Sequence, residues 1–188
     1  MGITSAQDMD GLELELLARL YEQVLLKDLP NRALSAGDIQ AWHRRWLGNV
    51  YPWAGQARSV NLSKDGFAFA AAGQIPRLLA EFERDCLGRW TPCHGMGEAD
   101  LVEAVAITHV ELILIHPFRE GNGRLSRLLA DAMAVQAGRE PLDYSSWEVN
   151  KADYIGAIHQ GFLSNYGPMK RCVEQAMGIA DHRFRPPA

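Results

Sequence analysis

The sequence predicts an all-α fold with one small β-hairpin. Apolar residues recur at helical spacing over most of the 188 residues. Only one short stretch alternates apolar and polar residues, and it surrounds Asp65 and Gly66. The apolar content of 47% is enough to form a core, and no repeat, linker or low-complexity segment divides the chain. We therefore expect one domain over residues 1–188.

The first two predicted helices lie at 11–26 and from Ser35 to Gly48. Residues 11–26 place apolar side chains along one stripe. The Ser35 hydroxyl can accept a hydrogen bond from the first turn of a helix, and Asp38 follows three residues later. The apolar face of this second helix consists of Ile39, Trp42, His43, Trp46 and Leu47.

The hairpin is expected from two short segments, 58–63 and 67–69. Val60 and Leu62 alternate with polar residues in the first segment. An Asp-Gly pair lies between the two segments, and this pair favours the tight turn that joins antiparallel strands. These are the only residues of the chain for which we predict strands.

Helical spacing returns over 74–88 and again over 98–115, which is the most apolar of the predicted helices. Its uninterrupted pattern predicts a central helix that is buried nearly all round. The proline at position 117 ends this helix at His116, because a residue before proline is pushed out of the α region.

Three further helices are expected after this break. The first begins near Asn122 and ends at Gly138, which supplies its C-terminal cap. Two shorter helices are predicted at 151–163 and 168–178, and the tail 183–188 is expected to be loose.

Composition excludes several classes of protein. The net charge of -4 argues against broad nucleic-acid binding, which needs a concentrated basic face. No apolar run approaches the ~20 residues that a membrane span requires, and the start has no secretory signal. Three cysteines without regular spacing indicate free thiols in a reducing compartment. We therefore expect a soluble cytoplasmic protein without a membrane or direct nucleic-acid partner.

Residues 116–127 read HPFREGNGRLSR and combine several groups suited to a nucleoside triphosphate. The start of the next helix offers free N–H groups, and the glycines at 121 and 123 let a phosphate approach the backbone. Arg124 and Arg127 lie three residues apart on one helix face and can bind phosphate oxygens. Glu120 is a carboxylate suited to Mg²⁺, and His116 is suited to accept a proton.

Each of these residues also has an ordinary structural interpretation. His116 on its own suits a core histidine, Gly121 to Gly123 suit a simple turn, and the arginines suit a solvated face. Only the combination of base, carboxylate, anion-binding turn and arginine pair favours chemistry. The dinucleotide pattern G-x-G-x-x-G is excluded, because Ser126 occupies the third glycine position and the segment follows a helix.

The segment HPFREGNGRLSR resembles the signature of Fic-domain proteins, H-x-F-x-[D/E]-G-N-G-R-x-x-R, at every specified position. YPWAGQARSVNLSKDGFAF also resembles the lead-in and flap of that family, so that the resemblance covers about residues 12–165. It implies the Fic fold, a helical core with a β-hairpin flap over the active site. It also implies transfer of AMP from ATP to a Tyr, Thr or Ser hydroxyl of a target protein.

The resemblance assigns a role to individual residues. His116 matches the catalytic base, Phe118 a core anchor and Glu120 the Mg²⁺ ligand. The phosphate-binding positions match Gly121, Asn122, Gly123, Arg124 and Arg127. The flap that holds the target as an added strand matches residues 64–69, including Lys64, Asp65, Gly66 and Phe67. Tyr154 lies near the position of an aromatic that contacts the nucleotide base, although a tyrosine on an amphipathic helix is more often a core residue.

Many Fic proteins carry an inhibitory helix with the pattern [S/T]-x-x-x-E-[G/N], and its glutamate pairs with the second arginine of the signature. No glutamate of this sequence, including Glu13, Glu15 and Glu174, has Ser or Thr four positions before it. The resemblance therefore implies an unregulated enzyme or the toxin of a bacterial toxin–antitoxin pair, whose small antitoxin supplies the inhibitory glutamate. Toxins of this family can modify type II topoisomerase subunits, which suggests a target by analogy.

Three alternatives remain open. The transferred group could be UMP, phosphocholine or the γ-phosphate, although Gly123 stands where the phosphate-transferring branch of the family has lysine. The chain could be a non-catalytic helical binding module, which the intact His116 and Glu120 argue against. A DNA-binding regulator is disfavoured by the acidic net charge.

Overall fold

The computed structural model describes residues 5–179 of the protein. The predicted loose tail, 183–188, lies outside the described residues, as do the first four residues of the N-terminal start. The α-helices are α1 (Ala6–Tyr21), α2 (Ala36–Leu47), α3 (Ile75–Phe82), α4 (Gly88–Trp90), α5 (Glu98–Ile115), α6 (Asn122–Gln136), α7 (Ser145–Val149), α8 (Lys151–Gly161) and α9 (Gly167–Ala176). Two strands, β1 (Ser63–Lys64) and β2 (Phe67–Ala68), form one antiparallel hairpin. The all-α prediction with one hairpin is confirmed.

Three shorter helical turns complete the chain. A π-helical turn at Glu22–Lys27 continues α1, a 3₁₀ turn at Ala72–Gln74 precedes α3, and a second π-helical turn at Glu83–Leu87 joins α3 to α4. None of the helices within residues 5–179 is both long enough and apolar enough to cross a bilayer.

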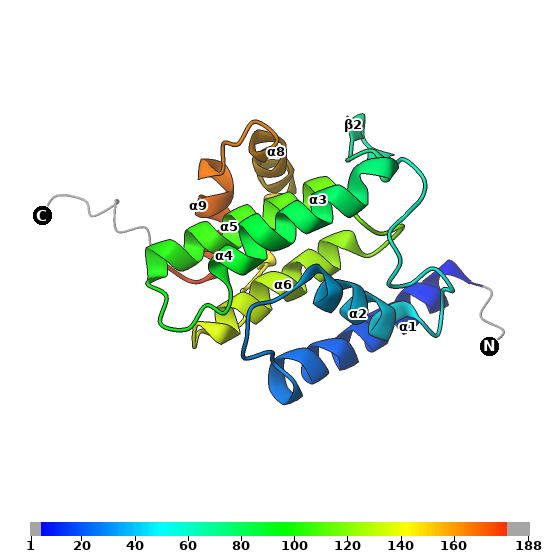
Figure 1. Ribbon diagram of the computed structural model, residues 1–188, viewed down its shortest axis with the longest axis horizontal. Helices are drawn as coiled ribbons and strands as arrows, with labels where there is room; N and C mark the ends of the chain where they lie inside the picture. The colour runs from blue at the N-terminus through cyan, green and yellow to red at the C-terminus, as the bar shows by residue number, and fades with distance from the viewer. Residues whose placement is uncertain (1–4, 180–188) are drawn as a thin grey trace, which may run out of the picture.

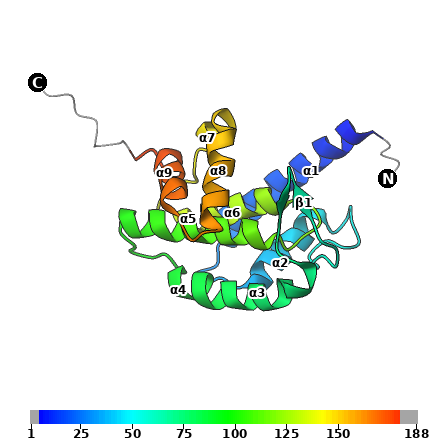
Figure 2. The ribbon, with the colours of Figure 1, turned by 90° about the horizontal axis from the view of Figure 1, so that it is seen from above.

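The two central helices, α5 and α6, pack against each other through the middle of the molecule (Figure 1). α1 and α2 cover one side of this pair, while α8 and α9 cover the opposite side. Figure 2 shows α3 and α4 along a further face of α5, away from α7 to α9. This arrangement explains why α5 is apolar nearly all round after its first turn: most of its residues from Leu101 onward are buried, and the helix packs against α3, α6, α8 and α9.

Local signals account for several helix ends. Ser35 caps α2 in a capping box: its side chain accepts from the backbone N–H of Asp38, and the Asp38 carboxylate accepts from the backbone N–H of Ser35. Gly138 follows α6 with a φ of +76°, as expected for a left-handed C-terminal cap. The first helix starts earlier than predicted, at Ala6, because the Ser5 hydroxyl accepts from the N–H of Asp8 at 3.0 Å.

Two further features differ from the prediction. The strands contain two residues each rather than the whole of 58–63 and 67–69, because residues 58–62 mainly hydrogen-bond outside the hairpin. The short helix α7 was not predicted, since five residues are too few to show helical periodicity.

Candidate active site

The loop between α5 and α6 turns sharply at both ends. His116 ends α5 in the left-handed conformation, with φ 50° and ψ 59°, and Gly121 precedes α6 with φ 81°. Between them, the Asn122 side chain accepts from the N–H of Phe118 and donates to its carbonyl, both at 2.9 Å. The Asn122 side chain therefore closes the loop, so that only its backbone N–H remains for a phosphate.

The first backbone N–H groups of α6 form the anion-binding part of the loop. The first hydrogen bond within α6 runs from Leu125 to the carbonyl of Gly121 at 2.9 Å. The N–H groups of Asn122, Gly123 and Arg124 come before it, in the turn that has no intrahelical acceptor. These donors and the positive end of the helix dipole favour a phosphate at this position.

Phe118 and His43 fix the loop to the core. Phe118 is buried, and its ring stacks on His43 with centroids 3.9 Å apart. The His43 Nδ1 accepts from the N–H of Gly55 at 2.7 Å, so its Nε2 carries the proton and donates to the Glu120 carbonyl at 3.1 Å. Burial lowers the pKa of His43, which keeps the ring in this neutral form.

His116 is fixed as a neutral imidazole. Its Nδ1 donates to the Ile113 carbonyl at 3.1 Å, and its ring stacks on Phe69 with centroids 3.6 Å apart. This tautomer leaves Nε2 as the acceptor. Burial lowers the pKa of His116 to about 4, and the charges of Arg58 and Lys64 act in the same direction. Near neutral pH, His116 can therefore accept a proton.

Glu120 presents its carboxylate to the cavity in front of α6. The side chain is exposed, and its Oε1 accepts from the N–H of Gly121 at 2.8 Å and from Arg124 at 3.2 Å. Within residues 5–179, no group of three or more His, Cys, Asp or Glu side chains could hold a metal ion. A single carboxylate fits Mg²⁺, which takes most of its remaining ligands from substrate phosphates and water.

The guanidinium of Arg124 is held by α1. Its Nη1 lies 3.0 Å from the carboxylate of Glu13, and its plane lies over the ring of Trp46 at 4.6 Å. Glu13 is only 5% exposed, and its other oxygen accepts from the Tyr51 hydroxyl at 2.8 Å. A buried carboxylate therefore sets the position of the first arginine of the predicted phosphate site.

Arg127 has different partners from Arg124. Its Nη2 lies 2.6 Å from the carboxylate of Glu148 on α7, and its guanidinium lies over the ring of Tyr144 at 4.9 Å. The two arginines line one cavity, as their spacing predicts, but they pair with carboxylates on different helices, α1 and α7.

Tyr154 lies at the inner wall of the same cavity and is only 9% exposed. Its hydroxyl lies 2.9 Å from Nε2 of His109, and its ring stacks on Trp147 with centroids 4.8 Å apart. These contacts account for Tyr154 as a core residue, and they leave little of its ring surface for a nucleotide base.

The hairpin turn contains Asp65 and Gly66, with φ values of 51° and 81°. Two consecutive left-handed residues match the tight turn that the Asp-Gly pair predicts. Lys64 pairs with Phe67 across the turn, and the Phe67 ring stacks on His159 of α8 with centroids 4.4 Å apart. The hairpin therefore leans on α8 beside the loop.

One cavity of about 440 Å³ brings the predicted residues together. Its walls come from the hairpin, the 116–121 loop, the start of α6 and helix α8. Of the predicted site residues, the following line it: Lys64, Asp65, Phe67, His116, Glu120, Gly121, Asn122, Gly123, Arg124, Arg127 and Tyr154. Gly66, at the tip of the hairpin, is not part of the lining.

Residues 33–134 match the family model described as the Fic/DOC family. The chain belongs to this family. The match contains the hairpin, α5, the 116–121 loop and most of α6, so that it covers most of the candidate site.

The curated relatives of this Fic chain are much longer proteins. The protein adenylyltransferase fic-1 of Caenorhabditis briggsae is 31% identical over 152 residues, which are 80% of this chain and 29% of the relative. The protein adenylyltransferase Fic of Drosophila yakuba is 34% identical over 115 residues, 61% of this chain and 22% of the relative. The chain thus spans less than a third of the length of these relatives.

Solved structures show the same Fic fold. The Bartonella tribocorum effector BepC, solved with bound AMPPNP, has a TM-score of 0.77 at 21% identity and covers 93% of this chain and 89% of its own. A fragment of Fic-1 from C. elegans has a TM-score of 0.70 at 26% identity and covers 94% of this chain and 51% of its own.

Glu13, His43 and Glu148 are among the residues at the Fic site that the sequence did not assign to it. Glu13 lies four positions before the buried Leu17, on the apolar face of α1. A carboxylate on such a face was a usable signal, because a buried charge needs a partner. His43 likewise lies on the apolar face of α2, whereas exposed Glu148 carried no comparable signal.

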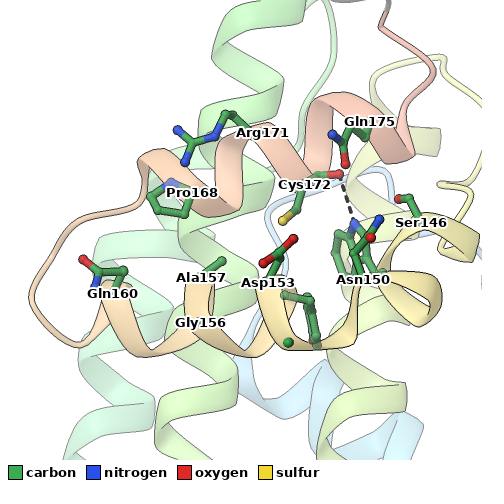
Figure 3. A pocket seen from close by; sticks show the side chains of 13 residues that line it. Ser146, Asn150, Asp153, Gly156, Ala157, Gln160, Pro168, Arg171, Cys172 and Gln175 are labelled. Atoms are coloured by element: carbon green, nitrogen blue, oxygen red, sulfur yellow. Dashed lines mark hydrogen bonds between the residues drawn. The ribbon is translucent and has the colours of Figure 1, made fainter.

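A second cavity of about 520 Å³ lies between α7, α8 and α9 (Figure 3). Asp153 and Cys172 face each other across it, and the Cys172 carbonyl accepts from the Trp147 indole at 3.0 Å. Burial raises the pKa of the Cys172 thiol; the charge of Arg171 partly opposes this, and the charge of Asp153 adds to it. The Cys172 thiol in this groove of the Fic domain is therefore protonated near neutral pH, which makes it a poor nucleophile.

Proposed function

We propose that this Fic domain transfers AMP from ATP to a Tyr, Thr or Ser hydroxyl of a target protein. The observation that carries the proposal is the shared cavity of about 440 Å³, where His116 and Glu120 lie with the start of α6 and two arginines. The curated relatives are protein adenylyltransferases by name, which supports the same reaction. The AMPPNP in BepC and the ADP in a Bartonella quintana Fic domain support ATP as the donor.

The reaction assigns His116 the role of base. Its Nε2 takes the proton of the target hydroxyl, and the hydroxyl oxygen then attacks the α-phosphorus of ATP in line. The bond between the α-phosphorus and the bridging oxygen breaks, and pyrophosphate leaves. The lowered pKa of His116 suits this step, because the ring is already neutral before the hydroxyl arrives.

The remaining loop residues neutralise the charge of the phosphates. The N–H groups of Asn122, Gly123 and Arg124 bind phosphate oxygens, and Arg127 meets the outer phosphate after it exchanges Glu148 for that group. Glu120 would hold Mg²⁺, which supplies charge neutralisation between neighbouring phosphates when it is bound. The recorded hydrogen bonds of the Glu120 carboxylate, from Gly121 and Arg124, both use Oε1, so that Oε2 remains for the metal ion.

The hairpin offers a place for the target protein. Lys64, Asp65 and Phe67 line the cavity beside His116, and residues 64–69 include β2, an edge strand of the one β-ribbon among residues 5–179. An extended target segment that pairs with this edge would bring its hydroxyl to the base. The buried Tyr154 supplies at most a wall behind the nucleotide base.

We further propose that a partner controls the site as an antitoxin controls a toxin. Arg127 already pairs with one carboxylate, Glu148, which supports the idea that an external glutamate can occupy the same place. Three free cysteines support a reducing compartment, the cytoplasm. A topoisomerase subunit is one target to test by analogy. If this protein slows bacterial growth, co-expression with the small protein encoded beside its own gene should restore that growth. Failure of any small partner to bind this protein would contradict the proposed control by an antitoxin.

The first test is a transfer assay. Purified protein is incubated with Mg²⁺, α-labelled ATP and a bacterial lysate, beside a His116→Ala control. A labelled band that requires His116 would establish AMP transfer, and mass spectrometry would identify the target. A band with γ-labelled ATP alone would replace this proposal with phosphate transfer, and no band with either label would contradict the use of ATP.

A further inference from the structure

The carbonyl groups at the end of α5 need donors from outside the helix, because a helix leaves its last carbonyls without intrahelical donors. The backbone N–H of His116 donates to Leu112 at 3.0 Å, and its ring Nδ1 donates to Ile113 at 3.1 Å. The N–H of Ala70, just after the hairpin, donates to Leu114 at 3.2 Å. Two of these three donors belong to the proposed base itself.

Arg58 supplies donors to the next three carbonyls. Its Nε donates to the His116 carbonyl at 2.7 Å, and its Nη2 makes a longer contact of 3.4 Å with the Ile115 carbonyl. Its backbone N–H donates to the Pro117 carbonyl at 2.8 Å. Arg58, which precedes the hairpin, thus hydrogen-bonds to the carbonyls on both sides of His116 as well as to that of His116 itself.

The same guanidinium also binds both ends of the hairpin segment. Its Nη1 donates to the Val60 carbonyl at 2.5 Å, and its Nη2 donates to the Ala70 carbonyl at 2.6 Å. Residues 61–69, which contain the target-binding flap, lie between these two carbonyls. Arg58 therefore connects the flap and the proposed base through a single planar group.

Burial and charge set Arg58 apart from the other arginines of residues 5–179. It is 2% exposed, and no carboxylate among residues 5–179 lies within ion-pair distance of it. Burial lowers the pKa of Arg58, but a guanidinium keeps its charge in proteins. Carbonyl oxygens at the negative end of α5 offset the cost of burying this charge. Lysine has three donors on one atom and cannot span the same set of carbonyls.

We propose that Arg58 is a positioning residue for the transfer reaction: it holds the flap at a set distance from His116, so that a target hydroxyl bound by the flap meets Nε2. The inference rests on the proposed function, and it adds a residue outside the 116–127 segment to the working site. Arg58 makes none of its hydrogen bonds with the phosphate-binding residues 121–127. Its loss should therefore affect the rate of transfer and leave nucleotide affinity intact.

The test compares Arg58→Lys and Arg58→Met with Arg77→Lys, an exposed arginine of α3 that pairs with Glu81. Three quantities are measured: the rate at which lysate proteins are labelled from α-labelled ATP, the Kd for AMPPNP, and amide hydrogen exchange over 61–69. We expect Arg58→Lys to lower the labelling rate ten-fold or more, with the Kd within two-fold and faster exchange in the flap. Arg77→Lys should match the wild type in all three.

Two results would overturn the inference. One is labelling at the wild-type rate in Arg58→Lys with unchanged flap exchange. The other is a loss of AMPPNP affinity as large as the loss of rate, which would indicate a general structural role. If Arg58→Met fails to fold, the comparison of Arg58→Lys with the wild type is the test of the proposal. If the wild-type protein labels nothing, the proposed transfer reaction is refuted instead. Amide exchange in the flap and AMPPNP affinity then test whether Arg58 holds the flap in place.

Discussion

Gly121 lies directly against the indole ring of Trp46: a β-carbon at position 121 would stand 2.5 Å from Cζ3 of that ring. The backbone of Gly121 also has a φ of +81°, which L side chains rarely adopt. The entry to α6 therefore depends on a glycine for two separate reasons. Its neighbour Gly123 is different, because a β-carbon there would meet no atom within 4 Å.

Gly121→Ala should reduce the free energy of unfolding by about 2 kcal/mol or more, since the left-handed backbone alone costs about 1–2 kcal/mol and the Trp46 ring must also move. Gly123→Ala is the matched variant. It should leave stability unchanged or slightly higher, because alanine favours the helix, and yet weaken AMPPNP binding by crowding the phosphate site. Denaturant unfolding and titration calorimetry measure the two effects. Equal stability of the two variants would contradict the packing argument.

The rate of transfer should stay flat as the pH falls from 8 to about 5. The pKa of His116 is lowered to about 4, so the ring stays neutral over this range and remains able to accept a proton. Activity should fall only as the pH passes through about 4. The measurement is kcat/KM for labelling against pH, with circular dichroism to verify the fold at each pH. An acid limb near 6.5, the ordinary value for histidine, would refute the burial of the base.

Glu13→Gln should lower the free energy of unfolding by about 1–2 kcal/mol. It removes the charge from a buried carboxylate that holds Arg124, and the estimate is reduced because Arg124 is partly exposed. Glu15→Gln is the control on the same helix, where an exposed pair with Arg19 should contribute less than ~0.5 kcal/mol. Both values come from urea unfolding, and equal losses in the two variants would count against the role of Glu13.

Glu148→Gln should tighten AMPPNP binding a few-fold with little change in stability. The Glu148 carboxylate competes with a phosphate for Arg127, while its exposed ion pair stabilises the fold by less than ~1 kcal/mol. Glu98→Gln is the matched control, because Glu98 pairs with Arg139 at the far end of α5 from His116. Calorimetric titration with AMPPNP measures the Kd of each variant. Unchanged or weaker binding in Glu148→Gln would show that this carboxylate does not compete.

The elements and motifs that could be predicted from the sequence are those that depend on residues close together in the chain. Helical spacing located α2, α5 and α6 closely, because burial of one face repeats along the chain. The capping box at Ser35, the turn at Asp65 and the break before Pro117 are likewise local, since each rests on residues within four positions. The site residues of the segment 116–127 could be predicted for the same reason, because they follow one another in the sequence.

The side chains that complete the site come from distant parts of the chain and are brought together by packing. Arg58 meets His116 from 58 residues away, His43 meets Glu120 across 77, and Glu13 meets Arg124 across more than a hundred. Helical periodicity shows that Glu13 and His43 face inward, but it cannot say which group each one meets there. Glu148 and Tyr154 could not be placed either, since exposure and partner choice depend on how α7 and α8 pack. Packing between distant segments sets these pairs, and the spacing of residues along the chain does not contain that information.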